Sequence, residues 1–266
     1  MILFNNIRNA GQEASKANLH PCRLLTQWAL YKKDHSTGRY DTSRVDKDTI
    51  LNCIKIIGND NRLVVLDFED WPLQGSADVI QETMYKMLEA VDIFREYAPG
   101  LRLGIYPVPP RTSWHAVYNW YKFKKDKTSK WYGEAKKVYK WWSGQNSLYA
   151  KGKRKNYHYE CVVDHVDFIC PDIYIPYNTD DALKFWPIFG REHIKIARKH
   201  KKNVYPYISP YLQAKDKTLL PTKSWIKMLD TCKKYADGAI IYTAVDLDPN
   251  IEWWVATKEW IANNSV

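Results

Sequence analysis

The 266-residue sequence predicts an α/β fold: a single TIM-like (β/α) barrel, with seven strands or with some other distortion of the regular ring. Short apolar segments rich in β-branched residues alternate with longer segments of helical periodicity. Outside one long insertion the strands recur about every 35–40 residues, as parallel strands joined by helices require. No glycine-rich phosphate turn follows a strand, which disfavours the alternative, a doubly wound open sheet.

Six strands are expected from the clusters of apolar and β-branched residues. They lie at about 23–31, 63–69, 101–108, 166–174, 203–208 and 238–242. A barrel needs one or two more, and these are expected within the first 60 residues. Residues 1–20 are polar and mixed, and we expect a short helix or an ordered arm there.

Helices are expected between the strands and after the last one. They lie at about 43–57, 76–98, 129–142, 180–199, 222–235 and 251–263. Ser76 is a typical N-cap for the second of them, and Pro99-Gly100 stops it. Gly58 ends the first helix in the same manner.

The chain is expected to form one catalytic domain over residues 1–266, with a basic, aromatic-rich insertion at about 111–160. Hydrophobic residues make up 45% of the chain, as in globular proteins. No apolar run approaches the roughly 20 residues of a membrane span, so no membrane partner is expected. Residues 1–8 lack the basic start and long apolar region of a secretory signal. We therefore expect a protein that stays inside a cell or virion, or a secreted one whose signal has been removed.

The stretch Leu63–Trp71 is the most informative part of the sequence. A buried strand continues there directly into three acidic residues, Asp67, Glu69 and Asp70. Side chains alternate along a strand, so Asp67 and Glu69 are expected on one face, about 6–7 Å apart. An isolated Asp-x-Glu is more often a solvated acidic loop. The flanking aromatic residues Phe68 and Trp71 favour a site instead, and two close carboxylates suit acid–base catalysis.

Aromatic or acidic residues recur where the predicted strands end. They are Trp28, Tyr31, Asp67, Glu69, Tyr106, Asp172, Tyr174, Tyr205, Tyr207, Tyr242 and Asp246. Active sites of (β/α) barrels gather at this end of the strands. Tyrosine rings around carboxylates suit a carbohydrate, because the rings contact sugar faces and the hydroxyls bond sugar groups.

Five segments together resemble the hyaluronidase family of glycoside hydrolases, in the order in which the family has them. They are Leu66-Asp67-Phe68-Glu69-Asp70-Trp71, Gly104-Ile-Tyr106-Pro-Val-Pro, Pro171-Asp-Ile-Tyr174-Ile-Pro176, Val204-Tyr-Pro-Tyr207 and Gly238-Ala-Ile-Ile-Tyr242. The chain departs from the family at Phe68 and Tyr242, which stand where the family has tryptophan. It is also shorter than the family and lacks clear matches to the family's disulfide cysteines. The resemblance is that of a distant, shortened relative.

The resemblance implies a retaining hydrolysis of an N-acetylhexosamine-containing polysaccharide, in which the substrate's own acetamido group is the nucleophile. Glu69 would be the general acid and base, and Asp67 would orient the acetamido group and stabilise the positive intermediate. Tyr174 would bond the acetamido oxygen. The substrate-binding residues implied or expected are Tyr106, Tyr174, Tyr207, Tyr242, Trp71 and Asp70. Independently of any family, two close carboxyl groups in a shielded site hold a proton that one of them can donate.

Net charge indicates an anionic polymer as partner. The formal charge is +10, with 12 Trp and 19 Tyr, which suits an anionic polysaccharide or nucleic acid. Nucleic acid is disfavoured because no nucleic-acid-binding motif is present. The seven histidines and five cysteines show no ligand spacing, so no metal and no cofactor is expected. The cysteine count and spacing also argue against a full disulfide framework.

Two other functions stay open. A lysozyme-like muramidase also suits a basic barrel, but such enzymes usually need a further aspartate near the first strand, where this chain has Gln27 and Trp28. A non-catalytic barrel that binds glycans or nucleic acids could use the basic runs Lys122–Lys127 and Lys151–Lys155. Each basic run is otherwise read as a solvated loop.

Overall fold

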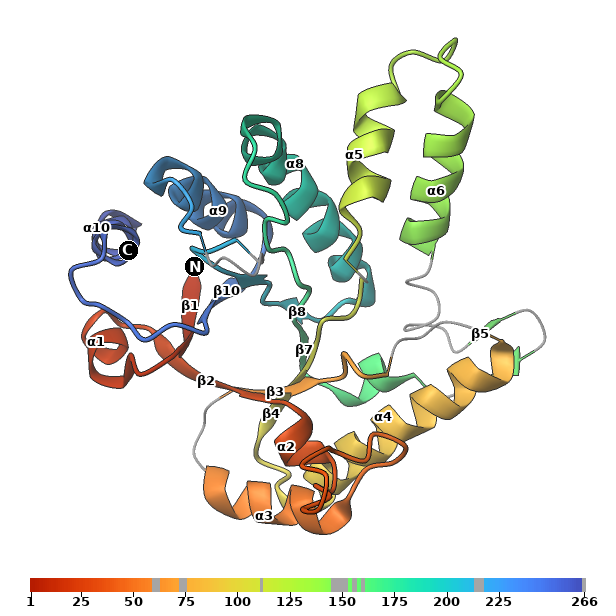
Figure 1. The fold of residues 1–266 in the computed structure, drawn as a ribbon, viewed down its shortest axis with the longest axis vertical. Coiled ribbons are helices and arrows are strands. Elements are labelled where there is room, and N and C mark those ends of the chain that lie inside the picture. The colour runs from red at the N-terminus through yellow and green to blue at the C-terminus, as the bar shows by residue number, and fades with distance from the viewer. Residues whose placement is uncertain are drawn as a thin grey trace.

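Eight of the described strands form one parallel sheet that curls into a barrel surrounded by helices (Figure 1). A computed structural model describes residues 1–58, 63–71, 76–110, 112–144, 153–154, 157–158, 161–212 and 218–264. The sheet has the order β8-β7-β4-β3-β2-β1-β10-β9. Its segments are β1 (Ile2–Ile7), β2 (His20–Leu25), β3 (Leu63–Asp67), β4 (Arg102–Tyr106), β7 (Phe168–Ile169), β8 (Asn203–Val204), β9 (Tyr207–Ile208) and β10 (Gly238–Thr243).

The sheet closes into a ring through β8 and β9, which are two halves of the strand expected at 203–208. β8 pairs with β7, and β9 pairs with β10 on the other side. Between the halves, the Tyr205 amide donates to Ile169 O at 2.9 Å, and Pro206 O accepts from the Ile240 amide at 2.9 Å. Counting 203–208 as one strand, the eight described segments occupy seven positions. The expectation of a TIM-like (β/α) barrel, with seven strands or with some other distortion of the ring, is confirmed.

The first strand lies where the sequence predicted a helix or an arm. β1 runs in parallel register with β10, with Asn6 opposite Tyr242, and it also pairs with β2. The sequence did not locate this strand because Asn5 and Asn6 interrupt the apolar run that marks a buried strand. The short helix expected within residues 1–20 is present as α1 (Gly11–Lys16), and β1 is a further strand of the kind expected within the first 60 residues. The strand expected at 23–31 is also corrected: β2 spans His20–Leu25, and a short helix, α2 (Gln27–Leu30), follows it.

Helices cover the outside of the barrel. They are α1 (Gly11–Lys16), α2, α3 (Lys47–Ile57), α4 (Ala77–Tyr97), α5 (Trp114–Phe123), α6 (Tyr132–Gly144), α8 (Asp180–Ala197), α9 (Thr222–Tyr235) and α10 (Glu252–Asn264). Side-chain caps fix several starts: Ser76 accepts from the Val79 amide, and Thr179 accepts from the Ala182 amide. None of the helices in the described ranges is long and apolar enough to span a membrane.

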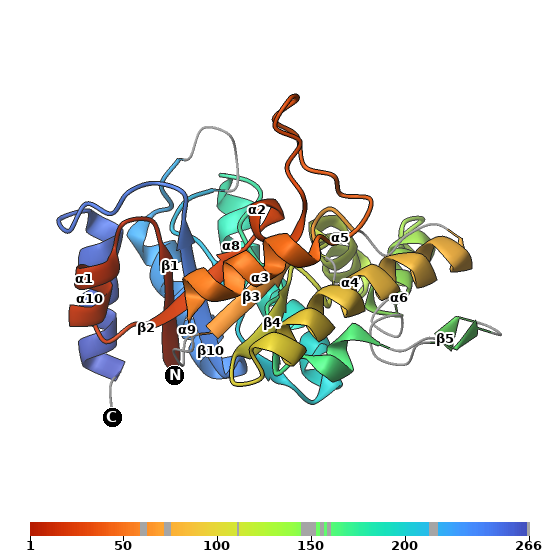
Figure 2. The ribbon, with the colours of Figure 1, turned by 90° about the horizontal axis from the view of Figure 1, so that it is seen from below.

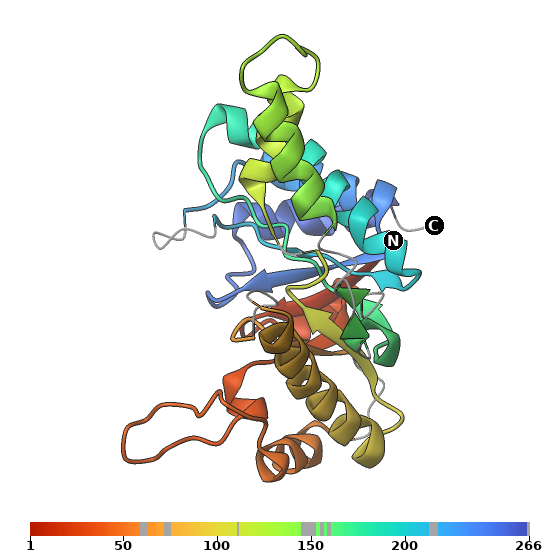
Figure 3. The same ribbon diagram turned by 90° about the vertical axis from the view of Figure 1, so that its right-hand side faces the viewer.

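The insertion contains two helices where one was predicted. α5 and α6 form a hairpin that projects sideways from the barrel (Figures 1 and 3). α5 is anchored by Trp114, whose ring meets Phe185 and Phe189 of α8 at centroid distances of 5.4 and 4.9 Å. A small antiparallel pair follows, β5 (Lys153–Arg154) with β6 (Tyr157–His158). Most of the basic run Lys151–Lys155 lies outside the described residues.

The hydrophobic core has two parts, and the smaller part fills the inside of the barrel between its two ends. Its members are Phe4, Leu63, Val65, Tyr106, Phe168, Cys170, Tyr174, Tyr205, Tyr207 and Ile240. Gly104 of β4 admits the Phe168 ring, since a Cβ at this position would lie 2.1 Å from a ring carbon. Apolar and aromatic side chains therefore fill the inside of the barrel, and polar residues gather at the carboxyl end of the strands. All five cysteines are free thiols in the structure.

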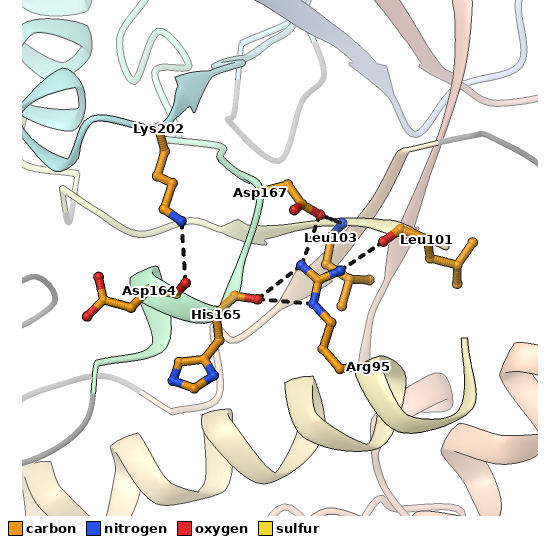
Figure 4. A network of polar contacts seen from close by, with 7 residues as sticks. All are labelled: Arg95, Leu101, Leu103, Asp164, His165, Asp167 and Lys202. Carbon is orange, nitrogen blue, oxygen red and sulfur yellow. Dashed lines mark hydrogen bonds and ion pairs between the residues drawn. The ribbon is translucent and has the colours of Figure 1, made fainter. Parts of the chain in front are cut away.

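Two arginine–aspartate clamps tie helices to strand starts. Asp167, just before β7, accepts from Arg95 of α4 at 2.9 Å and from the Leu103 amide of β4 at 2.8 Å. Arg95 also donates to His165 O and Leu101 O (Figure 4). The arrangement recurs at Asp237, just before β10, which accepts from Arg198 and from the Val204 amide of β8. Each carboxylate satisfies a strand amide that has no ladder partner at the strand start.

Candidate active site

Asp67 is the last residue of β3 and points into the barrel. It shares the inward face of the strand with Leu63 and Val65, which belong to the interior core. The next residue, Phe68, is buried on the opposite side, and its amide donates to Tyr106 O at 2.9 Å. Asp67 is partly exposed. The carboxyl group therefore lies at the carboxyl end of the barrel, above a filled interior.

Glu69 comes close to Asp67 through a turn and not through a continued strand. The expected strand 63–69 ends at Asp67, and the Trp71 amide donates to Phe68 O at 3.0 Å to close the turn. The Glu69 amide donates to the Asp67 carboxylate at 3.0 Å. Glu69 and Asp70 are exposed. The predicted pair is thus brought together, with Glu69 nearer to solvent and Asp67 deeper.

The pKa values of both carboxyl groups are raised. Burial raises the pKa of Asp67 to about 7, and the charges of Glu69 and Asp70 contribute, against a backbone hydrogen bond that lowers it. Burial also raises the pKa of Glu69, assisted by the Asp70 charge. Near neutral pH the pair therefore retains a proton that ordinary carboxyl groups would have lost. A carboxyl group that keeps its proton near neutral pH can act as a general acid.

Four predicted tyrosines from four strand ends form one cluster of rings, and Tyr106 and Tyr242 of this cluster lie beside the carboxyl pair. The Tyr106 and Tyr207 rings lie 4.9 Å apart between centroids, Tyr207 and Tyr242 lie 6.3 Å apart, and Tyr174 and Tyr242 lie 6.1 Å apart. Burial raises the pKa of Tyr106, and the nearby charges of Asp172, Glu69 and Asp67 raise it further. The pKa of Tyr242 is raised by burial and by the same Asp67 and Glu69. These hydroxyls stay protonated and can donate hydrogen bonds.

Asp70 and Trp71 flank the pair but sit differently from each other. Asp70 is exposed, and the side-chain amide of Gln27 donates to both of its oxygens at 3.0 Å. Trp71 is buried, stacks on Phe68 at 5.8 Å, and donates from Nε1 to Thr42 O at 2.8 Å. Its ring joins the turn to the loop between α2 and α3. That loop projects beyond the carboxyl ends of the strands (Figures 2 and 3).

Two further polar residues lie at this end: Asp172, which the sequence places at a strand end without a role in the site, and Asn6, which the sequence does not indicate. Asp172 is 6% exposed, accepts the Tyr174 amide at 3.0 Å and forms a bridge with Tyr207. Its place two residues before Tyr174, at a strand end, was the available signal. Asn6 of β1 donates to the Tyr207 hydroxyl at 3.4 Å. Asn6 was not predicted as a site residue because the sequence did not locate its strand, β1.

Tyr31 adds a buried hydroxyl beside the acidic turn. Its ring contacts Trp71 edge-on at 5.1 Å, and burial raises its pKa, followed by the charges of Asp70 and Asp67. The hydroxyl has no hydrogen-bond partner among the described residues. Among all the residues that the structure describes, no three His, Cys, Asp or Glu side chains are grouped so as to hold a metal ion.

Comparison with known proteins identifies the fold. No protein-family model matches the chain, and no curated protein matches its sequence. The structure is similar to that of bee venom hyaluronidase, with a TM-score of 0.61 and 13% identity over 99% of this chain and 97% of that one. The same venom enzyme in complex with a hyaluronic acid tetramer gives 0.58 and 14% over 99% and 96%.

A second kind of polysaccharide-degrading enzyme has the same fold. A double mutant of the endo-β-1,4-mannanase of Cellulomonas fimi gives a TM-score of 0.55 and 11% identity over 95% of this chain and 56% of that one. The protein therefore has the α/β barrel fold found in these glycosidases. At such identities the likeness identifies the fold alone, and the function has to be argued from the site.

Proposed function

We propose that the protein is a glycoside hydrolase that cleaves a polysaccharide containing N-acetylhexosamine, as the hyaluronidase-like segments of the sequence suggest. The observation that carries the proposal is the carboxyl pair Asp67–Glu69. It lies at the carboxyl end of a barrel, both its pKa values are raised, and Tyr106 and Tyr242 lie beside it, packed against the rings of Tyr174 and Tyr207. Raised carboxyl pKa values beside polar ring hydroxyls are typical of sites that protonate a leaving group.

The proposed reaction proceeds with retention in two steps. Glu69 donates its proton to the glycosidic oxygen while the acetamido oxygen of the substrate attacks the anomeric carbon. The bond to the leaving sugar breaks, and a positively charged oxazolinium forms. Glu69, now ionised, then takes a proton from water as the water oxygen attacks the same carbon. The ring of the intermediate opens, and the acetamido group and the protonated Glu69 are regenerated.

The positions of the two carboxyl groups support this division of roles. Glu69 is exposed and can reach a glycosidic oxygen of a bound chain, whereas Asp67 is deeper and held by the Glu69 amide. A positive charge forming beside Asp67 would favour its ionised form, because opposite charges lower a carboxyl pKa. Asp67 would then stabilise the oxazolinium. Tyr174 would donate to the acetamido oxygen, while Tyr106, Tyr207 and Tyr242 would shape the sugar site.

The muramidase alternative gains no support from the first two strands. The residues that reach the site from them are Asn6 of β1 and Gln27 after β2, and neither is an acid. Gln27 instead binds Asp70. A further aspartate of the kind that such barrels usually need is not found in these two positions.

Cleavage assays on a panel of polymers test the proposal. Hyaluronan, chondroitin, chitin and peptidoglycan carry acetamido groups, whereas mannan and cellulose do not. We expect cleavage within the first group, with product of retained configuration. Glu69→Gln should reduce the rate at least about 1,000-fold, since it removes the proton donor. Glu259→Gln, an exposed residue of α10, is the matched control and should keep full activity.

Each outcome has a distinct meaning. Cleavage of mannan or cellulose alone would retain a glycosidase but remove the role of the acetamido group. Full activity of Glu69→Gln would remove Glu69 as the acid. A folded wild-type protein that cleaves none of the polymers would overturn the proposal.

A further inference from the structure

Two adjoining grooves lie on the outside of the barrel, where α5 of the insertion packs beside α8. The first has a volume of about 600 Å³ and the second about 570 Å³. Both are lined by Tyr121 and Arg191, so they meet at these two side chains, and the two together are here called the hairpin groove. The other lining residues are Tyr118, Lys122, Lys124, Lys125, Phe185, Ile188, Glu192, Lys195, Arg198 and Tyr235. None of these residues belongs to the carboxyl pair or to the tyrosines around it.

The hairpin groove concentrates positive charge with little compensation. Six of its lining residues are Lys or Arg. Two of them are ion-paired, Arg191 with the lining acid Glu192, which is 3% exposed, and Arg198 with Asp237. Lys122, Lys125 and Lys195 are exposed and form no ion pair with any described residue. Such a cluster of cations attracts an anion of the surroundings.

Buried contacts hold the centre of the groove in place. The carboxylate of Glu192 accepts from the hydroxyls of Tyr121 at 2.8 Å and Tyr139 at 2.6 Å. Arg191 donates to Glu192 at 3.2 Å and to the Tyr121 hydroxyl at 2.7 Å. The guanidinium that lines both grooves is thus fixed before any ligand arrives, which lowers the entropy cost of binding.

The surroundings of Lys124 also indicate an excess of positive charge in the hairpin groove. Its Nζ lies 3.3 Å from the centroid of the Tyr121 ring. Burial lowers its pKa, and the neighbouring charges of Arg191, Lys125 and Lys195 lower it further, against the opposite effect of Glu192. An anion bound in the groove would relieve this repulsion.

We propose that the hairpin groove is a binding site for an anionic polysaccharide, separate from the carboxyl pair. Its carboxylate or sulfate groups would bind the lysines and Arg191, and its apolar sugar faces would lie on Phe185 and Ile188. Two adjoining grooves, each lined by cations, suit one polymer strand better than a single small anion. The proposal goes beyond the catalytic function, because a chain bound here would be held on the outer helical layer and not at the strand ends.

The rings of the groove favour a polysaccharide over single-stranded nucleic acid. Bases bind chiefly by stacking on open aromatic faces. One face of Tyr121 is covered by Lys124, and the Tyr118 ring is stacked on Trp114 at 6.2 Å with an interplanar angle of 17°. Phe185 meets Tyr118 edge-on at 5.1 Å. Fixed cations remain available, and these are what an anionic sugar chain requires.

Fluorescence anisotropy with labelled heparin and hyaluronan oligosaccharides tests the proposal. The measurements use the Glu69→Gln background, so that cleavage cannot remove the probe. Lys122→Gln/Lys125→Gln removes two exposed charges of the groove. Lys130→Gln/Lys137→Gln removes two exposed charges of the same hairpin outside it and is the matched control. Circular dichroism verifies that both double variants fold.

We expect the groove variant to bind at least one of these oligosaccharides about fivefold or more weakly, and the control to lose less than about twofold. Raising the salt concentration should reduce this difference. Equal losses in both variants would show that bulk charge alone binds the probe and would overturn the proposal. Tighter groove-dependent binding of single-stranded DNA or poly-glutamate would overturn it too. Because affinity is measured without catalysis, an inactive wild-type protein would not affect the result.

Discussion

Asp67, Glu69 and Asp70 are three acids in four residues, and their depth in the structure separates their chemistry. Asp67 ends a strand inside the barrel, whereas Glu69 and Asp70 belong to an exposed turn. Burial is the main cause of the raised pKa at both Asp67 and Glu69, and neighbouring charge is the second. The two causes can be separated by mutation, because Asp70 contributes only charge.

Asp70→Asn should shift the pH dependence of cleavage. The negative charge of Asp70 raises the pKa of Glu69, so its removal lowers that pKa and Glu69 loses its proton at a lower pH. The basic limb of the pH–rate profile should therefore move to lower pH, with little change at the acidic plateau. Asp48→Asn on α3, an exposed aspartate elsewhere, should leave the profile in place. An unmoved basic limb in Asp70→Asn would contradict the coupling.

Asp67→Asn should abolish most of the activity and yet stabilise the protein at alkaline pH. The pKa of Asp67 is about 7 in the folded protein against an ordinary 3.8, so between these values the folded state holds a proton that the unfolded chain has lost. Stability therefore falls as pH rises through this window, by roughly 2–4 kcal/mol in all. Asparagine removes this loss.

Chemical denaturation of Asp67→Asn and wild type at pH 4 and pH 8 measures the effect. The free energy of unfolding of the variant should exceed that of wild type at pH 8 but not at pH 4. An equal difference at both pH values would show that the charge of Asp67 is not the cause.

At the scale of elements, β4 and β7 depend on one close approach inside the barrel. Gly104→Ala would place a Cβ 2.1 Å from the Phe168 ring, and the ring has no free space because its own side chain is fully buried. We expect a loss of about 2–4 kcal/mol from overpacking, measured by denaturation. Gly133→Ala in α6 meets nothing within 4 Å and should be neutral or stabilising by up to about 1 kcal/mol. Similar losses in the two variants would contradict this account.

The clamp at Asp167 should contribute to stability more than its partial exposure suggests. Asp167→Asn removes the ion pair with Arg95 and weakens the acceptor of the Leu103 amide. We expect a loss of about 1–3 kcal/mol in the free energy of unfolding. Asp164→Asn is the control, since only the main-chain oxygen of Asp164 takes part in this network (Figure 4). A loss no larger than that of the control would show that the clamp is not stabilising.

For the whole molecule, the sequence predicted the barrel and most of its helices because their signals are local. Ser76 caps α4 as expected, and the strand at 203–208 was found as one segment. Its division around Pro206 depends on which neighbour each half meets, β7 or β10, and this is a non-local property. β1 could not be located from the sequence because it carries Asn6 where a core strand has an apolar residue. The same Asn6 contributes to the candidate site, since it donates a hydrogen bond to the Tyr207 hydroxyl.

The sequence predicted which residues form the candidate site better than it predicted how they are arranged. Alternation along a strand placed Asp67 inward correctly, but the turn after it, which brings Glu69 back by its amide, cannot be read from alternation. Asp172 is buried between tyrosines of two strands, and its partners become visible only when the ring is closed. Trp71 is held by Thr42 of a distant loop, a contact that no local pattern encodes.

The pairing of β1 with β10 has a consequence for biosynthesis. Residues 2–7 leave the ribosome long before their partner at 238–243, because the rest of the barrel lies between the two segments in the sequence. Until then β1 can bond only β2 and presents a row of unpaired backbone groups on its other side. Most of the chain must therefore be translated before the ring can be sealed, and a nascent barrel of this kind is exposed to intermolecular strand pairing throughout that interval.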